Sequence, residues 1–198
     1  MNNKSHLLEN SERLFQEAKS LEDTDKKTAA RFFINGHEVL ASYYMANDMD
    51  EYAQEIEAAT ALKLNYIKDY NEHVGPETQI NYVFLCLSIN EIERAKEFCS
   101  FEIDYKNSHK FSILLNCLLR RILGIPLLGK EPKYKPTKTE AGLFSALQNV
   151  IDNQAIDDIA LHKYWRATKS KRYQLTIFEN RDLFSQASIS KSSLGLSK

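Results

Sequence analysis

The sequence FSILLNCLLRRILGIPLL, residues 111–128, is the most apolar stretch of the chain. Its large apolar side chains recur every three or four residues, which is the spacing of one face of an α-helix. A membrane-spanning helix needs about 20 mostly apolar residues, but Asn116, Arg120 and Arg121 interrupt this stretch, and adjacent arginines at mid-bilayer depth are costly. We therefore predict a buried core helix that ends where Gly124 and Pro126 deny its continuation.

The same spacing recurs along most of the chain. Residues 7–21, 29–44, 52–70, 80–87, 92–99, 141–151 and 156–167 each hold an apolar helical face. The face in 52–70 reads Tyr52, Ile56, Ala59, Tyr66, Ile67 and Tyr70. Alternation typical of a strand occurs only weakly, after residue 170. The sequence predicts an all-α fold of antiparallel helical hairpins, forming an irregular bundle or a degenerate TPR-like helical array.

Helix-capping residues and helix-breaking Gly and Pro residues occur at the expected ends of these helices. Asp48-Met49-Asp50-Glu51, Asn90-Glu91-Ile92-Glu93 and Thr137-Lys138-Thr139-Glu140 each place a capping oxygen three residues before a Glu, as in a capping box. Gly75-Pro76 ends one helix and opens the next. Gly36 lies inside a helical pattern, which predicts a close approach of a neighbouring helix at this point.

These boundaries divide the 198 residues as follows. We predict a helical-hairpin array in residues 1–123, a Pro- and Lys-rich connection in 124–136, C-terminal helices in 137–184 packed on the first part to form one domain overall, and a frayed Ser-rich tail in 185–198. Ala53 and Ala95 occupy equivalent places in two similar hairpins, 42 residues apart, a spacing within the range of helical-hairpin repeats. Capped antiparallel helices also resemble one another without being repeats.

Charge is distributed unevenly along the chain. The formal net charge is −1 in total, but residues 1–99 carry 18 acids and 10 bases, whereas residues 100–198 carry 9 acids and 16 bases. The first residues lack the apolar segment of a secretory signal. Cys86, Cys99 and Cys117 form no CxxC pair and fall on apolar faces, so we expect buried, reduced thiols. A cytoplasmic location follows, with no membrane partner.

Motifs for catalysis are nearly absent. The five histidines stand apart from other metal ligands, and the six glycines form no phosphate-binding loop. Arg31 and His37 fit the Arg–His spacing of HEPN-type ribonucleases, a short pattern that also arises by chance. We expect no catalytic residues, no metal and no cofactor, and hence no enzyme.

Two surfaces could bind a partner. Lys163, Arg166, Lys169, Lys171 and Arg172 are interleaved with aromatic residues, but a sequence pI near 6.5 makes nucleic acid an unfavoured partner. Tyrosine and tryptophan suit protein interfaces because they bury area at low entropic cost, and nearby acids would attract a basic partner. The candidate partner-binding residues are Tyr43, Tyr44, Asp48, Asp50, Glu51, Tyr52, Glu55, Tyr66, Tyr70 and Trp165.

In pattern, the chain resembles the helical immunity proteins of bacterial toxin–immunity systems, and the immunity protein 49 family in particular. The resemblance rests on Tyr43-Tyr44-Met45-Ala46, Glu93-Arg94-Ala95-Lys96-Glu97-Phe98 and His162-Lys163-Tyr164-Trp165-Arg166-Ala167. It implies a cytoplasmic protein that binds one cognate toxin and blocks its active site. The resemblance does not assign a function to any individual residue of this chain. A helical-repeat adaptor that binds a peptide or protein is the alternative, and an RNA-acting HEPN-like protein is the third.

Overall fold

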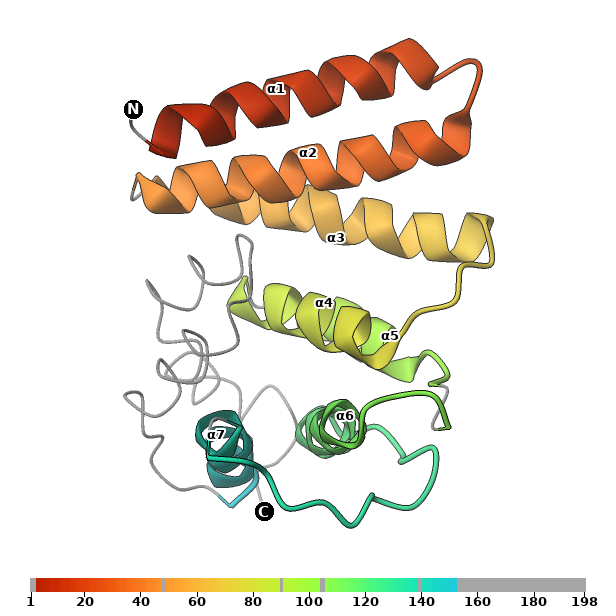
Figure 1. Ribbon diagram of the computed structural model, residues 1–198, viewed down its shortest axis with the longest axis vertical. Helices are drawn as coiled ribbons and strands as arrows, with labels where there is room; N and C mark the ends of the chain where they lie inside the picture. The colour runs from red at the N-terminus through yellow and green to blue at the C-terminus, as the bar shows by residue number, and fades with distance from the viewer. Residues whose placement is uncertain (1–2, 48, 90, 104–105, 139, 153–198) are drawn as a thin grey trace. The chain divides into compact units, whose positions relative to one another are not determined.

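The protein is all-helical in the part of the chain that the computed structural model describes, which confirms the predicted fold class. The described residues are 3–47, 49–89, 91–103, 106–138 and 140–152. They form seven helices and no strand (Figure 1): α1 (Asn3–Leu21), α2 (Lys26–Ala46), α3 (Tyr52–Asp69), α4 (Pro76–Ser88), α5 (Ile92–Ser100), α6 (Lys110–Ile122) and α7 (Ala141–Ile151). Trp165, the basic cluster at 163–172, the weak strand pattern and the tail at 185–198 lie outside the described residues.

The described chain divides into two compact units between His73 and Val74. Unit 1 contains α1, α2 and α3, and unit 2 contains α4, α5, α6 and α7. The division falls just before Gly75-Pro76, where the sequence predicted a helix boundary, and α4 indeed begins with Pro76 at its first position. The connection at 124–136 lies inside unit 2.

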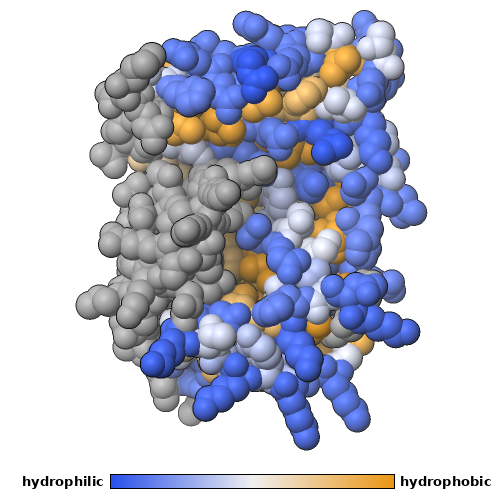
Figure 2. Space-filling view, viewed as in Figure 1, coloured by the Kyte–Doolittle hydropathy of each residue, from blue (hydrophilic) through white to orange (hydrophobic). Residues whose placement is uncertain are grey.

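Unit 1 is a run of two antiparallel helical hairpins. Helix α2 packs against α1 on one side and α3 on the other, and short turns at 22–25 and 47–51 join them (Figure 1). On the face shown in Figure 2, apolar residues of this unit lie mainly along the seam between α1 and α2, whereas hydrophilic residues cover the outer sides. The core includes Leu14, Ala18, Ile34, Ala41, Ile56 and Ala59.

At Gly36 the backbone of α2 lies close to the Phe15 ring of α1. A Cβ atom at this position would lie 2.7 Å from Cε1 of Phe15, closer than side chains tolerate. The predicted close packing at Gly36 is therefore confirmed, and Phe15 is the residue that requires it.

Of the three predicted capping boxes, the structure confirms the one before α7. Thr137 and Glu140 form the predicted capping box, because the Thr137 amide donates to Glu140 Oε2 at 2.8 Å and the Glu140 amide donates to Thr137 Oγ1 at 3.3 Å. The prediction for α3 is wrong, since its N-cap is Glu51, without a capping side chain; Asp48 is not among the described residues. The N-cap of α5 is Glu91, one residue beyond the predicted Asn90.

Unit 2 is built around α6. Every residue from Phe111 to Arg120 is buried, because α4, α5 and α7 each pack against this helix. The predicted core helix is thus confirmed. In the described residues no helix combines the length and the apolar character needed to cross a membrane. Cys86, Cys99 and Cys117 are buried free thiols of this unit, as expected.

Candidate partner-binding surfaces

The predicted tyrosine-rich surface divides into a buried part and an exposed part. Tyr52 and Tyr66 are only 7% and 3% exposed and belong to the core of unit 1. Their assignment as partner-binding residues is therefore corrected. The signal for this was in the sequence, because both side chains share the helical face of Ile56, Ala59 and Ile67 and are buried with them.

Tyr70 is half-buried at the C-terminal end of α3, and local contacts occupy its ring. Its centroid lies 5.1 Å from that of Tyr66. Lys27 Nζ lies 5.6 Å from the Tyr70 ring and forms an ion pair of 3.0 Å with Glu72. The cation over the ring is a favourable arrangement. Tyr70 thus helps to join the start of α2 to the end of α3, and it lies at the opposite end of these helices from Tyr43 and Tyr44.

At the other end, Tyr43 and Tyr44 lie in the last turn of α2 and, like Tyr70, are half-buried. Their ring centroids are 5.6 Å apart. The chain then folds back, since the Met49 amide donates to the Tyr44 carbonyl oxygen at 2.9 Å. The exposed Asp50 and Glu51 follow in this turn, and Glu51 lies close enough to Tyr44 to act on its hydroxyl electrostatically. We call Tyr43, Tyr44, Asp50 and Glu51 the acidic turn.

Glu51 and Glu55 act on the hydroxyl of Tyr44. Burial raises the pKa of the Tyr44 hydroxyl above its ordinary value, and the carboxylates of Glu55 and Glu51 raise it further. A cation near this hydroxyl would therefore meet an aromatic ring and negative charge. The acidic turn therefore has the chemistry to receive a lysine or arginine side chain.

Glu55 has a different role from the one predicted. Its Oε2 atom lies 2.6 Å from Nδ1 of His37, which links α2 to α3. The side chains of His37 and Glu55 are 25% and 18% exposed, and the Phe15 ring packs edge-on against His37 at 4.9 Å. Glu55 contributes negative charge near Tyr44 but is already paired inside unit 1.

The Arg31–His37 spacing does not place its two side chains together. Six residues of an α-helix turn through about 600°, so the two positions are roughly 120° apart around α2. Arg31 is exposed, whereas His37 faces Phe15 and Glu55. Within the described ranges no group of three or more His, Cys, Asp or Glu residues is arranged to hold a metal ion.

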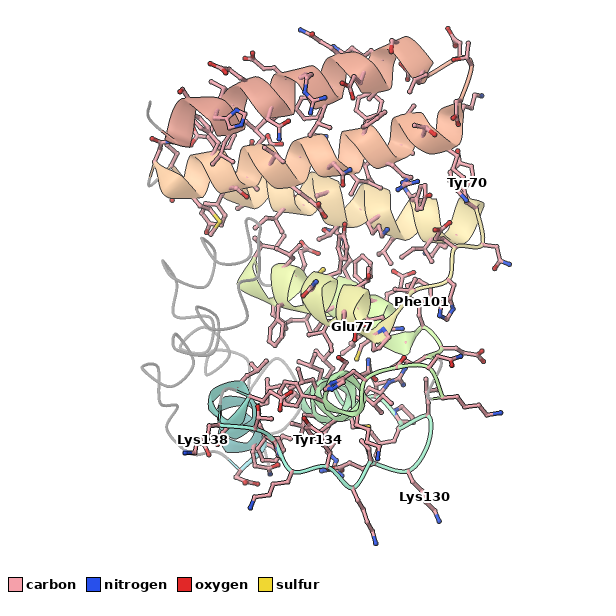
Figure 3. All side chains as sticks on the ribbon, viewed as in Figure 1. Tyr70, Glu77, Phe101, Lys130, Tyr134 and Lys138 are labelled. Atoms are coloured by element: carbon pink, nitrogen blue, oxygen red, sulfur yellow. The ribbon has the colours of Figure 1, made fainter. Side chains whose placement is uncertain are left out.

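A second surface, in unit 2, was not among the predicted sites. Residues 124–138 run along the outside of unit 2 without helical structure, and we call them the basic strap (Figure 1). Lys130, Lys133, Lys135 and Lys138 are all exposed. Figure 3 shows Lys130 and Lys138 pointing away from the helices.

The strap also exposes apolar side chains. Leu127 and Leu128 are 38% and 45% exposed, and they are the exposed large hydrophobic residues of the described chain. The combination of two adjacent leucines with four lysines is unusual for a solvated loop, because exposed apolar groups usually occur singly. The sequence predicted a Pro- and Lys-rich connection at residues 124–136, but the exposure of the two leucines was not predicted.

The strap is attached to the helices at several points. Gly124, at φ +68°, forms the turn after α6, with its amide donating to Arg121 O and the Ile125 amide donating to Arg120 O. Arg121 then pairs with Glu131 of the strap. Further along, the Tyr134 hydroxyl donates to Glu140 Oε2 at 2.9 Å, and its ring packs 6.0 Å from that of Phe111. The lysines thus project from a fixed backbone.

Arg120 is the deepest of these attachments. It is 1% exposed, and its three side-chain nitrogens donate to neutral oxygens: Nε to Asn116 Oδ1 at 3.0 Å, Nη1 to Pro126 O at 2.8 Å and Nη2 to Phe101 O at 3.3 Å. Asn116 Nδ2 in turn donates to Gln79 Oε1 at 2.8 Å. Arg120 is therefore not part of an exposed basic patch, and it binds α6 to the strap.

Comparisons with known proteins add no relationship. No family model matches the chain, and neither the curated proteins nor the solved structures yield a significant match.

Proposed function

We propose that the protein is a binding module that uses the acidic turn to hold a basic protein partner, and that this partner is a cognate bacterial toxin whose active site becomes blocked. The observation that carries the binding role is the exposure of Asp50 and Glu51 in the turn that follows the half-buried pair Tyr43 and Tyr44. The choice of a toxin rests on the resemblance to helical immunity proteins.

Physically, the acidic turn suits a partner that binds anionic substrates. Such a partner, for example an enzyme that cleaves nucleic acid, lines its cleft with lysine and arginine. Carboxylates speed the encounter with such a cleft, and the two tyrosine rings supply desolvated contact area once the complex has formed. Neutralisation then follows from occupation of the cleft and requires no chemistry by this chain.

The experiment is co-expression with a toxin encoded by the gene next to that of this protein. We expect the wild-type protein to restore growth and to form a complex with the toxin in size-exclusion chromatography. The double variant Asp50→Lys/Glu51→Lys should bind at least tenfold more weakly and fail to restore growth, since it reverses the charge of the acidic turn.

The matched control is Glu22→Lys/Asp23→Lys, which makes the same change of charge in the turn between α1 and α2. Both residues are exposed. This turn lies at the opposite end of α2, a helix of 21 residues and therefore about 30 Å long. Growth should be restored as by the wild type. A toxin that kills equally with and without the wild-type protein would overturn the proposal.

A further inference from the structure

The basic strap has a composition that restricts its partner. It offers four exposed lysines, one glutamate already paired with Arg121, and the exposed pair Leu127 and Leu128. The partner must supply negative charge for the lysines and apolar surface for the leucines. Because the strap is held by Arg120 and Tyr134, little ordering entropy opposes such binding.

Of the anionic partners, a polypeptide fits this surface best. Nucleic-acid surfaces use exposed aromatic rings for stacking, whereas the only aromatic residue of the strap, Tyr134, packs against Phe111 and donates to Glu140. For a bilayer, two leucine side chains carry fewer carbons than one myristoyl chain, which itself gives only marginal membrane binding. In a protein interface, by contrast, two apolar anchors surrounded by charges are sufficient for specific contact.

A surface with the complementary chemistry exists on this chain. The acidic turn exposes Asp50 and Glu51 shortly after the paired rings of Tyr43 and Tyr44, and Glu51 acts electrostatically on Tyr44. It belongs to unit 1, whose sequence range 1–73 holds 14 acids and 8 bases. Carboxylates can pair with the strap lysines while the tyrosine rings cover Leu127 and Leu128.

We propose that the basic strap of one molecule binds the acidic turn of a second copy of this chain. The contact is heterologous, since two different surfaces meet. The inference concerns the same acidic turn as the proposed function, and it makes self-association a competitor of the basic partner, so that free protein is stored with its binding surface covered.

The test is analytical ultracentrifugation of the purified full chain at low and high salt. At about 50 mM NaCl the wild type should show a concentration-dependent mass above the 22.9 kDa of one chain. At about 1 M NaCl, where the Debye length falls to about 3 Å, it should sediment as a monomer. Both Lys133→Glu/Lys135→Glu in the strap and Asp50→Lys/Glu51→Lys in the acidic turn should weaken self-association at least tenfold.

Mixing these two double variants is the decisive arm. Each variant retains one native surface, so the intact strap of one can bind the intact acidic turn of the other, and association should return in the mixture. A chain with both reversals should also self-associate again. Leu127→Ser/Leu128→Ser should weaken the association seen at low salt, although it leaves every charge of the strap in place. All these residues are exposed or half-exposed, and circular dichroism checks that helicity is unchanged.

Several results would overturn the inference: a wild type that is monomeric at every concentration, association that survives either charge reversal, or a mixture that stays monomeric. These results are separable from failure of the proposed function. Lys133→Glu/Lys135→Glu leaves the acidic turn intact, so this variant should still restore growth in the presence of the toxin although it no longer self-associates.

Discussion

Nη1 of Arg120 lies 2.8 Å from the carbonyl oxygen of Pro126, so a fully buried cation of α6 fixes the beginning of the exposed strap. The same guanidinium donates to the carbonyl oxygen of Phe101, the C-cap of α5. One side chain thereby joins two helix ends and the strap. Its position near the C-terminus of α6 is also favourable for a cation, because helix C-termini carry partial negative charge.

Replacement of Arg120 should be strongly destabilising. Arg120→Met keeps much of the side-chain volume but leaves the acceptors on Asn116 and Pro126 without the donor that Arg120 supplies, whereas Phe101 O keeps its hydrogen bond from Gln79 Nε2 at 3.0 Å. We expect a loss of about 2–4 kcal/mol in the free energy of unfolding, measured by urea denaturation. The matched control is Arg121→Met, which removes an exposed pair and should cost less than about 1 kcal/mol. Equal effects of the two variants would contradict the assigned role of Arg120.

The network around Arg120 shows where sequence patterns stop being informative. The apolar spacing of 111–122 identifies a buried helix correctly, because burial follows from periodicity. It does not reveal what Asn116 and Arg120 contact, since Gln79 and Phe101 come from other helices and lie 37 and 19 residues away along the chain. Such partners depend on tertiary packing.

The tyrosines illustrate a related limit. Tyrosine is compatible with a core or with an interface, since its ring is apolar and its hydroxyl polar. Periodicity alone would have assigned Tyr52 and Tyr66 to the core, where they are found. The half-buried pair Tyr43 and Tyr44 owes its position to the end of α2, where the chain turns. The strap surface was missed for a similar reason, because no periodicity exists in an irregular segment.

The contact between Gly36 and Phe15 should reverse the usual effect of a Gly→Ala substitution on stability. Gly→Ala within a helix usually stabilises by about 1 kcal/mol, but here the added Cβ would lie 2.7 Å from the Phe15 ring. We expect Gly36→Ala to destabilise the wild-type background by about 1 kcal/mol. In a Phe15→Leu background the same substitution should be neutral or stabilising. Thermal unfolding of the four proteins measures this coupling, and additive effects would contradict it.

The three thiols should be unreactive in the native protein. Cys86, Cys99 and Cys117 are each 0% exposed, and burial raises the pKa of Cys99 to about 12. Because the thiolate is the reactive species, an aromatic disulfide reagent at pH 8 should label no thiol rapidly in buffer and all three in denaturant. Rapid labelling of one thiol in the native state would show that its helix packing is incorrect.

The same pKa shift makes stability depend on alkaline pH. The unfolded thiol of Cys99 ionises near its ordinary pKa of 9.0, whereas the native thiol keeps its proton up to about pH 12. Above pH 9 the unfolded state is therefore favoured, and stability should fall as pH rises. Between pH 8 and 10 this thiol alone should cost about 1 kcal/mol. Urea denaturation of Cys99→Ala and of the wild type at several pH values measures how much of the fall in stability comes from Cys99. If the stability of both proteins fell equally with rising pH, the expectation would be wrong.

At acid pH the relevant group is Glu140, which closes the capping box of α7 and accepts from the strap residue Tyr134. Burial alone would raise the pKa of its carboxyl, but hydrogen bonds from Thr137 and Tyr134 outweigh burial and hold the pKa below its usual 4.5. The carboxylate therefore contributes stability that is fully present above pH 4.5. That contribution is lost as pH falls through the lower pKa of the folded state.

Glu140→Gln should cost about 1 kcal/mol at neutral pH, the usual value of a helix cap, and it should flatten the fall in stability between pH 5 and 3. The control is Glu93→Gln, which removes an exposed ion pair with Lys96 and should change neither quantity measurably. Urea denaturation at several pH values measures both the stability at neutral pH and its dependence on pH.

Because Glu140 holds Tyr134 as well as α7, the Glu140→Gln variant should also expose the strap to proteolysis at lower protease concentrations than the wild type. A cleavage pattern identical to that of the wild type would show that Arg120 and Arg121 suffice to hold the strap.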